Sequence, residues 1–389
     1  MTGDREGALA GVRVLDLSRV LAGPVATQSL ADLGAEVLKI ERPPGGDDTR
    51  SWGPPFVDGD RSAYFVAANR SKASLLVDLA APAGRDLVLE LARVADVVVE
   101  NFKPGGAAKL GLDAATLRAE NPRLVYASVR GFEADGLDAH RPGYDAVVQA
   151  AAGLMSITGE ADGPPLKVGV AIADVVCGLN LTSAILAALY ARERTGDGQA
   201  VEVSLEGAQA AALVNVAASV LNAGVEPERH GTAHPNLVPY QTFATADAPM
   251  VIAVGNDAQF AALCRALDRP EWADDARFAT NADRVTHRDA LVSAVQGILS
   301  TATRARWGAR LDAAGVPWGP VRTVPEVFAA HPGLAVASGD GLRTVRSPLH
   351  LSATPVVPPR APPHVGEGGA ALAAAWLGTT AEAIAARLP

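Results

Sequence analysis

The sequence predicts an α/β protein with a doubly wound parallel sheet in a large domain and a second, smaller α/β domain. Over the first 200 residues, short runs of β-branched residues alternate with stretches of helical periodicity, which is the pattern of βαβ units. After Gly198 this rhythm changes. The chain of 389 residues also exceeds the usual size of a single hydrophobic core, so we expect two domains.

The large domain is expected to contain five strands, each a run of apolar and β-branched residues. These runs are 12–17, 35–41, 74–79, 96–101 and 124–129. Helical periodicity predicts helices near 25–33, 83–95, 105–109, 114–120 and 169–196. In a doubly wound sheet the ligand lies beyond the carboxyl ends of the strands, so the loops that follow the strands are the candidate site.

The remaining elements are expected to form a linker and a small domain. The stretch "AVEVSL" predicts a short strand, and the Ala- and Val-rich residues 206–222 predict a long helix. A Pro-containing connection follows, and then a strand at 250–255, helices near 257–267 and 287–299, and a turn at 314–320. We therefore expect a large Rossmann-like domain over 1–200, a helical linker over 201–224 and a small α/β domain over 225–330.

Composition excludes several classes of function. A formal net charge of −9 and a pI near 5.3 argue against a general binder of nucleic acid or of acidic membranes. Cys177 and Cys264 form no metal or redox motif, and His230 and His234 have no cysteine partners. We therefore expect no metal site and a reduced, cytoplasmic setting. The N-terminus lacks a signal-peptide pattern, and polar residues interrupt the apolar run 175–191, which predicts a buried helix rather than a membrane span.

Asp174 stands near the start of the mostly apolar helix predicted over 169–196. One interpretation is a helix N-cap, because an Asp side chain can accept hydrogen bonds from the free N–H groups of the first turn. The other is functional, because a helix N-terminus also holds a carboxylate ionised and directed at an approaching ligand. The helix alone leaves both interpretations open.

The loops after the strands carry cations and small residues. The stretch "SRVLAGP" after the first strand is a small-residue turn that enters a helix, but it lacks the GxGxxG fingerprint of nicotinamide-dinucleotide sites. Each loop taken alone is compatible with a solvated turn. Together they place four cations around one predicted edge of the sheet: Arg19, Arg42, Lys103 and Lys109. This arrangement suits a ligand with several phosphates and an aromatic base.

Six stretches of the chain resemble the class III CoA-transferases, the CaiB/BaiF family that includes the carnitine and formyl-CoA transferases. They are "LAGPVATQSLADLGAEVLKIERPPGGDDTR", "ENFKPG", "RPGYDAVVQAAAGLMSITGEADGPPLKVGVAIADVVCG", "HPNLVPYQTFATADA", "AGVPWGPVRTVPEVF" and "RAPPHVGE". They cover nearly the whole chain in the family's order. The resemblance implies a homodimer of two chains interlocked like linked rings, with residues 335–389 completing the large domain. The Pro- and Gly-rich tail, which is unlike a core element, is then expected to wrap back onto that domain.

The resemblance implies that the protein transfers CoA between an acyl-CoA and a free carboxylic acid. The family's nucleophilic aspartate corresponds to Asp174, and the reaction passes through an aspartyl anhydride and an aspartyl-CoA thioester. A carboxylate with an ordinary pKa of about 4 is ionised at neutral pH and needs no base to activate it. The intermediates must be kept from water, and we expect backbone N–H groups near Gly178 to stabilise the oxyanion.

The family's binding residues can be placed one by one on this sequence. Tyr144 and Asp145 correspond to the pair that approaches the thioester, although Asp145 could instead cap a turn. CoA and acyl-CoA are expected as substrates, with no tightly bound cofactor. The expected CoA contacts are Arg19, Val20, Leu21, Ala22, Arg42, Val77, Asp78, Leu79, Ala80, Asn101, Phe102, Lys103 and Lys109.

Two other functions compete with this interpretation. An α-methylacyl-CoA racemase is expected to have a histidine where this sequence has Tyr144, and none of the seven histidines lies there. A non-catalytic acyl-CoA-binding protein would form no aspartyl adduct. For the acyl group, the glycine-rich loop of formyl-CoA transferases has no counterpart between Gly224 and Gln241. This argues against oxalate and formate as the substrate pair, and we expect succinyl-CoA or another dicarboxyl-CoA as donor.

Overall fold

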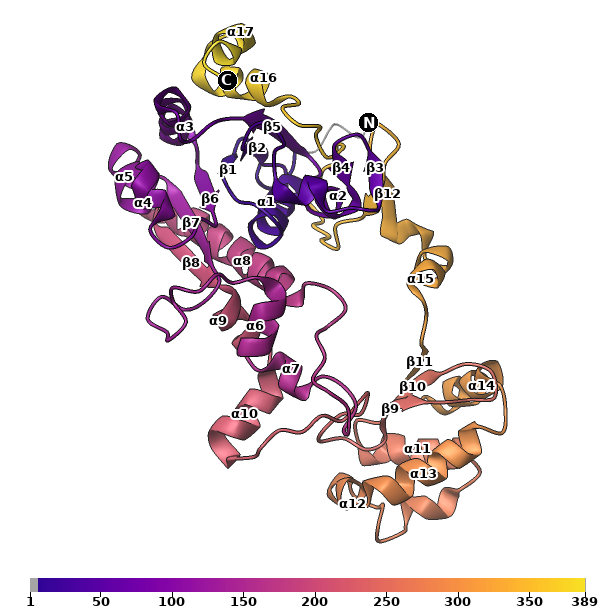
Figure 1. Cartoon of the computed structure of the whole chain (residues 1–389). Helices are drawn as coiled ribbons and strands as arrows, with labels where there is room; N and C mark the ends of the chain where they lie inside the picture. The colour runs from indigo at the N-terminus through magenta and orange to yellow at the C-terminus, as the bar shows by residue number, and fades with distance from the viewer. Residues whose placement is uncertain (1–5, 389) are drawn as a thin grey trace. The chain divides into compact units, whose positions relative to one another are not determined.

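The computed structural model describes residues 6–388, and the chain divides into two compact units (Figure 1). The first unit is built from Met1–Leu154, Lys167–Val225 and Gly333–Pro389, and the second from Met155–Leu166 and Glu226–Pro332. These boundaries differ from the expected ones in two places. Residues 201–224, expected to be a linker, belong to the first unit, and residues 155–166 belong to the second.

A six-stranded parallel sheet forms the centre of the first unit, in the order β5-β2-β1-β6-β7-β8. Its strands are β1 (Arg13–Asp16), β2 (Glu36–Glu41), β5 (Lys72–Leu76), β6 (Val97–Glu100), β7 (Val125–Arg130) and β8 (Ala200–Ser204). Counted in chain order, this is the 3-2-1-4-5-6 arrangement of doubly wound dinucleotide-binding folds. The predicted fold class is confirmed. The strand order reverses between β1 and β6, and that is where such folds bind their ligands.

Both faces of this sheet are covered by helices. Alternate residues of each strand point to opposite faces, and because apolar residues lie on both, each face is buried under a helical layer. Val14 of β1 packs on one face, with α1 (Ala22–Asp32), α8 (Ile172–Thr195) and α9 (Leu205–Ala211). Leu15 packs on the other, with α3 (Pro82–Val94), α5 (Ala114–Glu120), α16 (Gly369–Leu377) and α17 (Ala381–Ala385). The sheet therefore lies between two apolar layers and leaves its strand ends for a site.

Helix α8, with 24 residues, is the longest helix in the described part of the chain. Among the described residues it is the one helix that could cross a membrane by length and composition, and half of its most apolar window is buried. Its buried residues pack against the sheet and α1, as the sequence predicts. The close approach of the two helices requires Gly178, because a Cβ there would lie 2.7 Å from the carbonyl oxygen of Ala22.

The C-terminal segment returns to the first unit along β5 and the neighbouring loops. The backbone N–H groups of Ser71 and Ser74 donate to the carbonyl oxygens of Arg360 and Glu367, and Arg61 donates to the carbonyl oxygen of Pro362. Helix α16 follows and packs against α3 and β5 (Figure 1). The Pro-rich tail thus needs no core of its own, because its polar backbone is bound by the large unit.

Several short elements of the first unit have no clear sequence signal. They include β3 (Phe56–Asp58), β4 (Arg61–Ser62), α2 (Ala63–Ala68), α6 (Asp145–Ala151), β12 (Ala335–Ala337) and β13 (Arg343–Val345). The helix predicted near 105–109 is present as α4 (Gly106–Leu110), and α10 (Val214–Ala223) follows α9. The single helix predicted over 206–222 is divided into α9 and α10. The division falls beside Val214, which has a φ of 36°. An Ala- and Val-rich composition carries no signal for such a break.

The second unit contains a three-stranded antiparallel sheet, ordered β11-β10-β9, with helices packed around a core of its own. Its elements are β9 (Tyr240–Phe243), β10 (Met250–Ala253), α11 (Asp257–Ala266), α12 (Asn281–Thr286), α13 (Arg288–Leu299), α14 (Arg304–Ala314), β11 (Trp318–Pro320) and α15 (Val324–Ala330). The predicted strand at 250–255 and both predicted helices are present. The predicted turn at 314–320 ends in β11, which pairs with β10.

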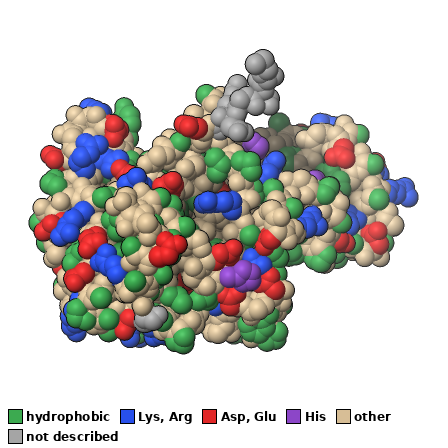
Figure 2. Space-filling model, turned by 90° about the horizontal axis from the view of Figure 1, so that it is seen from above, with side chains coloured by type: hydrophobic (Ala, Val, Ile, Leu, Met, Phe, Trp, Pro, Cys, Tyr) green, Lys and Arg blue, Asp and Glu red, His purple; other side chains and the backbone are tan. Residues whose placement is uncertain are grey.

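The charged side chains on the face drawn in Figure 2 are mixed in sign. On the face drawn in Figure 2, Lys and Arg side chains are interspersed with Asp and Glu side chains and form no single continuous basic patch. This distribution accords with the formal charge of −9. On that face a phosphate-bearing ligand would meet individual cations rather than a broad positive surface.

Candidate functional site

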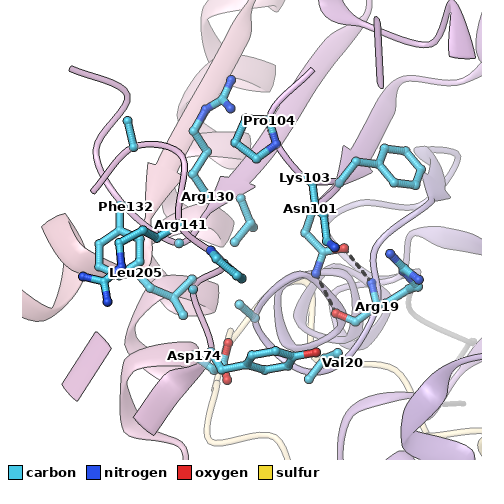
Figure 3. A pocket seen from close by; sticks show the side chains of 18 of the residues that line it. Arg19, Val20, Asn101, Lys103, Pro104, Arg130, Phe132, Arg141, Asp174 and Leu205 are labelled. Atoms are coloured by element: carbon cyan, nitrogen blue, oxygen red, sulfur yellow. Dashed lines mark hydrogen bonds between the residues drawn. The ribbon is translucent and has the colours of Figure 1, made fainter. Parts of the chain in front are cut away.

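A pocket of about 330 Å³ lies at the carboxyl ends of the parallel strands in the first unit. Its walls follow four strands: Arg19, Val20 and Ala22 come after β1, Asn101–Pro104 after β6, Gly131 and Phe132 after β7, and Leu205 after β8. The pocket is also lined by Asp48, Val129, Arg130, the segment 139–144 and Asp174. Figure 3 shows Arg19 and Asn101 on one side, Phe132 and Leu205 on the other, and the Asp174 carboxylate between them. The pocket thus occupies the place that the sheet topology predicts.

Asp174 is a buried acid in the first turn of α8. The N-cap of this helix is Ala171, which makes no side-chain cap, so the N-cap interpretation of Asp174 is wrong. The residue is 9% exposed. Desolvation by burial and repulsion from Asp145 raise the pKa of Asp174 to about 7, while a backbone hydrogen bond from Ala22 acts in the opposite direction.

This raised pKa corrects the expectation of an ordinary carboxylate. The helix N-terminus favours the ionised form, but removal from water outweighs that effect here. At neutral pH the carboxyl of Asp174 is therefore divided between its neutral and ionised forms. A carboxylate with a raised pKa is also a stronger base and nucleophile than an exposed one, once it is ionised.

Asp145 fixes the start of α8 and lies just outside the pocket lining. One of its carboxylate oxygens accepts from the N–H of Ala173 at 2.8 Å, and the other accepts from Gln149 Nε2 at 2.7 Å. Gln149 in turn accepts from the N–H of Val168 at 2.9 Å. Asp145 is thus a capping acid, but it caps α8 rather than a local turn, and its charge lies close enough to raise the pKa of Asp174.

The turn after β1 forms one wall of the pocket and is held by Asn101. The N–H of Arg19 donates to Asn101 Oδ1 at 2.9 Å, and Asn101 Nδ2 donates to the carbonyl oxygen of Arg19 at 2.7 Å; both bonds are drawn in Figure 3. The next residue, Val20, has a φ of 70°, a left-handed conformation that is uncommon for a β-branched residue. This turn leads directly into α1 and the Ala22 amide.

Four cations line the pocket. Arg19 lies 3.8 Å from Asp48, Arg130 pairs with Glu202, and Arg141 lies 2.9 Å from Asp138. Among the described residues, Lys103 has no salt-bridge partner. Lys103 is therefore the lining cation whose charge is least neutralised by the protein itself.

Other residues predicted to contact CoA lie outside this pocket. Arg42 is exposed and lies 3.6 Å from Asp48, and Val77 is buried in the apolar layer beneath α3. The remaining ones are Leu21, which is the N-cap of α1, the segment Asp78–Ala80, and Lys109 in α4. Their contacts with CoA remain predictions. Gly178 lies beyond the first turn of α8, where N–H groups are used within the helix, so it is not a suitable oxyanion donor.

The sequence interpretation missed several lining residues. Phe132 and Leu205 are buried and apolar, so in the sequence they resemble ordinary core residues. Their positions just after β7 and β8 are a signal that could have identified them. Tyr64 of α2, which is not among the lining residues, was also missed; burial and the charges of Asp174 and Asp145 raise its pKa to about 12. In the described part of the chain, no cluster of three His, Cys, Asp or Glu residues could hold a metal ion.

Comparison with known proteins identifies the family. The model of CoA-transferase family III matches residues 9–368. The chain belongs to CoA-transferase family III. Among curated family III relatives, the succinate–glutarate CoA-transferase of Agrobacterium fabrum is 46% identical over 94% of each chain. The acetyl-CoA:oxalate CoA-transferase of Acetobacter aceti is 42% identical over 94% of this chain and 95% of its own.

A solved structure extends this agreement to the fold. The crystal structure of a CaiB/BaiF family protein from Brucella suis is 43% identical, covers 96% of this chain and 100% of its own, and has a TM-score of 0.85. The resemblance found in the sequence is thereby confirmed. The protein is an enzyme of the CoA-transferase class, and its family uses acyl-CoA as substrate.

Proposed function

We propose that this enzyme transfers CoA from a dicarboxyl-CoA to a second carboxylic acid through covalent intermediates on Asp174. The observation that supports the proposal is the buried carboxylate of Asp174 at the strand-end pocket, next to the Ala22 amide. A nucleophile that attacks a thioester must reach the carbonyl carbon while water is kept away. Asp174 meets both requirements, because it lines the pocket and is 9% exposed.

The proposed reaction has four balanced steps. A carboxylate oxygen of Asp174 attacks the thioester carbonyl, the carbon–sulfur bond breaks, and CoA leaves as a thiolate. The thiolate then attacks the aspartyl carbonyl of the mixed anhydride, releasing the donor acid and forming an aspartyl-CoA thioester. The acceptor carboxylate attacks that thioester and again releases the thiolate. Attack of the thiolate on the acceptor's acyl carbon yields the new acyl-CoA and restores Asp174.

The surrounding residues support each requirement of these steps. The Ala22 amide hydrogen bond is directed at the Asp174 carboxyl, so it is a candidate donor to charge that develops there. Arg19 and Lys103 line the wall opposite Phe132, where cations can meet the phosphates of CoA. Tyr144, 61% exposed, lines the pocket at the position where a racemase is expected to have a histidine. This favours attack at the carbonyl over removal of an α-proton.

The acyl specificity is proposed from two sources. The sequence lacks the glycine-rich loop of formyl-CoA transferases, and the relative from Agrobacterium fabrum is named for succinate and glutarate. We therefore propose succinyl-CoA and a second dicarboxylic acid as the substrates. Oxalate belongs in the acceptor panel as well, because the relative from Acetobacter aceti is named for it.

The enzyme is further proposed to be a cytoplasmic, interlocked homodimer. Its two cysteines are buried and unpaired, as expected in a reducing compartment. Large apolar side chains are exposed on α8 and α10 of the first unit, including Tyr190 at 69% and Leu221 at 81%. Exposed apolar side chains of this size are typical of surfaces that a partner covers.

Trapping of the covalent intermediate tests the role of Asp174. Wild-type enzyme incubated with succinyl-CoA and hydroxylamine should give a hydroxamate at Asp174, located by peptide mass spectrometry. Asp174→Asn and Asp174→Ala should lose the adduct and lower kcat by at least about a thousandfold, the scale seen when a nucleophile is removed. CoA binding should persist.

Asp86→Asn, on the exposed face of α3, is the control and should form the adduct as wild type does. Wild-type turnover in either Asp174 variant would assign that residue a structural role only.

A further inference from the structure

The backbone of residues 18–20, in the turn after β1, is held by side chains from four separate segments. Asp16 accepts from the N–H of Ser18 at 3.0 Å, and Lys39 Nζ donates to the Ser18 carbonyl oxygen at 2.8 Å. Asn101 binds both backbone groups of Arg19, as described above. The N–H of Val20 points to the carboxylate of Asp47, at 3.3 and 3.4 Å from its two oxygens. The backbone of this turn is therefore bound by side chains at each of its three residues.

Lys39 and Asp47 form a fully buried ion pair beneath this turn. Lys39 Nζ lies 2.9 Å from Asp47 Oδ2, and neither side chain is exposed. Asp47 also accepts from the N–H and hydroxyl groups of Thr49 at 3.0 and 2.8 Å. A buried charge needs this degree of hydrogen bonding to offset its lost hydration. The carboxylate that faces Val20 is therefore fixed on several sides and cannot follow the turn if the turn relaxes.

Val20 is held in a conformation that its own side chain disfavours. Its φ of 70° lies in the left-handed region, where a Cβ branch makes residues other than glycine unfavourable. Such a conformation persists only when the surrounding structure imposes it. Asp47 is the side chain that binds the amide of Val20 itself, so the ion pair is placed to impose it.

The geometry of Val20 determines where the following amides point. Two residues later, Ala22 begins α1 and lines the same pocket as Asp174, where its backbone N–H opposes the raised pKa of the Asp174 carboxyl. We propose that the buried Lys39–Asp47 pair is a positioning pair, which holds Val20 in its left-handed conformation and thereby keeps the Ala22 amide directed at Asp174 during catalysis. This inference rests on the proposed role of Asp174 as the nucleophile.

A double-mutant cycle between Asp47 and Val20 tests the proposal. Asp47→Asn should slow aspartyl adduct formation from succinyl-CoA by at least tenfold while changing the KM for succinyl-CoA by less than threefold. Glycine adopts a positive φ without steric cost, so Val20→Gly in the Asp47→Asn enzyme should recover most of the lost rate, with Val20→Gly alone as the reference. A purely structural role of Asp47 predicts lower thermal stability and no recovery, and that result would overturn the proposal.

Asp32→Asn is the matched control. Asp32 forms another buried ion pair, 2.5 Å from Arg70, at the opposite end of α1. Its variant should lose stability as Asp47→Asn does but should form the adduct at the wild-type rate. If Asp47→Asn does not fold, Lys39→Met/Asp47→Asn removes both charges together and is tested with Val20→Gly in the same way.

The pH profile of adduct formation separates positioning from a long-range charge effect. Asp145 on α6, Tyr64 on α2 and Cys177 on α8 interact with Asp174, besides the Ala22 amide. The other ionisable side chains that share its pocket are Arg19, Asp48, Lys103, Arg130, His140, Arg141 and Tyr144. Loss of the Ala22 hydrogen bond should move the half-maximal pH upward in Asp47→Asn, whereas loss of the negative charge of Asp47 acting through space should move it downward. A downward or absent shift would overturn the proposal. A wild-type enzyme without any adduct would instead overturn the role of Asp174, and the inference with it.

Discussion

At the scale of the residue, the site depends on one acid whose chemistry follows from its surroundings. Asp174 is identified by its place in the sequence motif, and the structure places it in the pocket at the end of the sheet. Its ionisation could not be predicted, because that depends on burial and on Asp145, which lies 29 residues earlier in the chain. Sequence spacing gives the identity of a charged residue but not its distance from another charge in space.

The raised pKa of Asp174 predicts a pH dependence of activity. Only the ionised carboxylate attacks the thioester, so kcat/KM should rise with pH, reach half of its maximum near pH 7 and level off above it. Initial rates between about pH 5.5 and 9 measure this. A rate that is constant from pH 5.5 upward would show that Asp174 has an ordinary carboxyl pKa. Burial would then not be the dominant influence on the pKa of Asp174.

The raised pKa of Asp174 also predicts how the stability of the folded protein changes with pH. The folded pKa of Asp174, about 7, lies above the unfolded value of about 4. The folded state therefore binds the proton more tightly, and this contribution to stability is fully present below pH 4 and is lost as pH rises through about 7. Asp174→Asn, which cannot ionise, should accordingly be more stable than wild type near pH 8, as thermal unfolding can measure.

At the scale of the element, long apolar patterns were predictable and short or polar ones were not. The parallel strands are buried on both faces, so they read as continuous apolar runs, and five of the six lie where the large-domain prediction places them. Strand β8 was predicted as a strand but assigned to the linker. Short helices such as α2 and α6 are set by tertiary contacts and capping rather than by periodicity. The pocket residues Phe132 and Leu205 were missed for a related reason, because an apolar residue in a pocket looks like a core residue.

The contact between α1 and α8 gives a prediction for Gly178. A Cβ at this position would meet the Ala22 carbonyl oxygen at 2.7 Å and Val25 Cγ1 at 3.0 Å. Gly178→Ala should therefore destabilise the protein by about 1–3 kcal/mol through overpacking. It should also lower kcat, because α1 carries the Ala22 amide and α8 carries Asp174. Thermal unfolding and steady-state rates measure the two effects.

Gly297 provides the matched control for that substitution. It lies inside α13, and a Cβ there would meet no atom within 4 Å. Gly297→Ala should therefore stabilise its helix by up to about 1 kcal/mol, the ordinary difference in helix propensity, and leave kcat unchanged. If both glycine variants behaved alike, the close contact between α1 and α8 would not be a constraint on the site.

At the scale of the whole molecule, the C-terminal segment of the chain folds back onto the unit that contains the N-terminal half. Residues 333–389 belong to the same compact unit as the N-terminal half, and α16 contributes Ala373 and Trp376 to the apolar layer against α3. Trp376 Nε1 also donates to Glu36 at 2.7 Å. The division of the polypeptide into units is therefore not a simple sequence of consecutive domains. Composition alone could not show that the tail joins the first unit, because the Pro-rich tail has no periodic pattern that indicates which element it packs against.

The assembly state is the last prediction, and it concerns the exposed apolar side chains of α8 and α10. Tyr190, Val214 and Leu221 are each more than half exposed, and a partner that covers them would remove that apolar surface from water. Light scattering should therefore give a mass about twice the 39.8 kDa of one chain. Interlocked chains cannot separate without unfolding, so tagged and untagged dimers mixed under native conditions should exchange subunits only after denaturation and refolding. A monomeric mass at micromolar concentration would contradict the dimer, and rapid exchange between native dimers would contradict the interlocking.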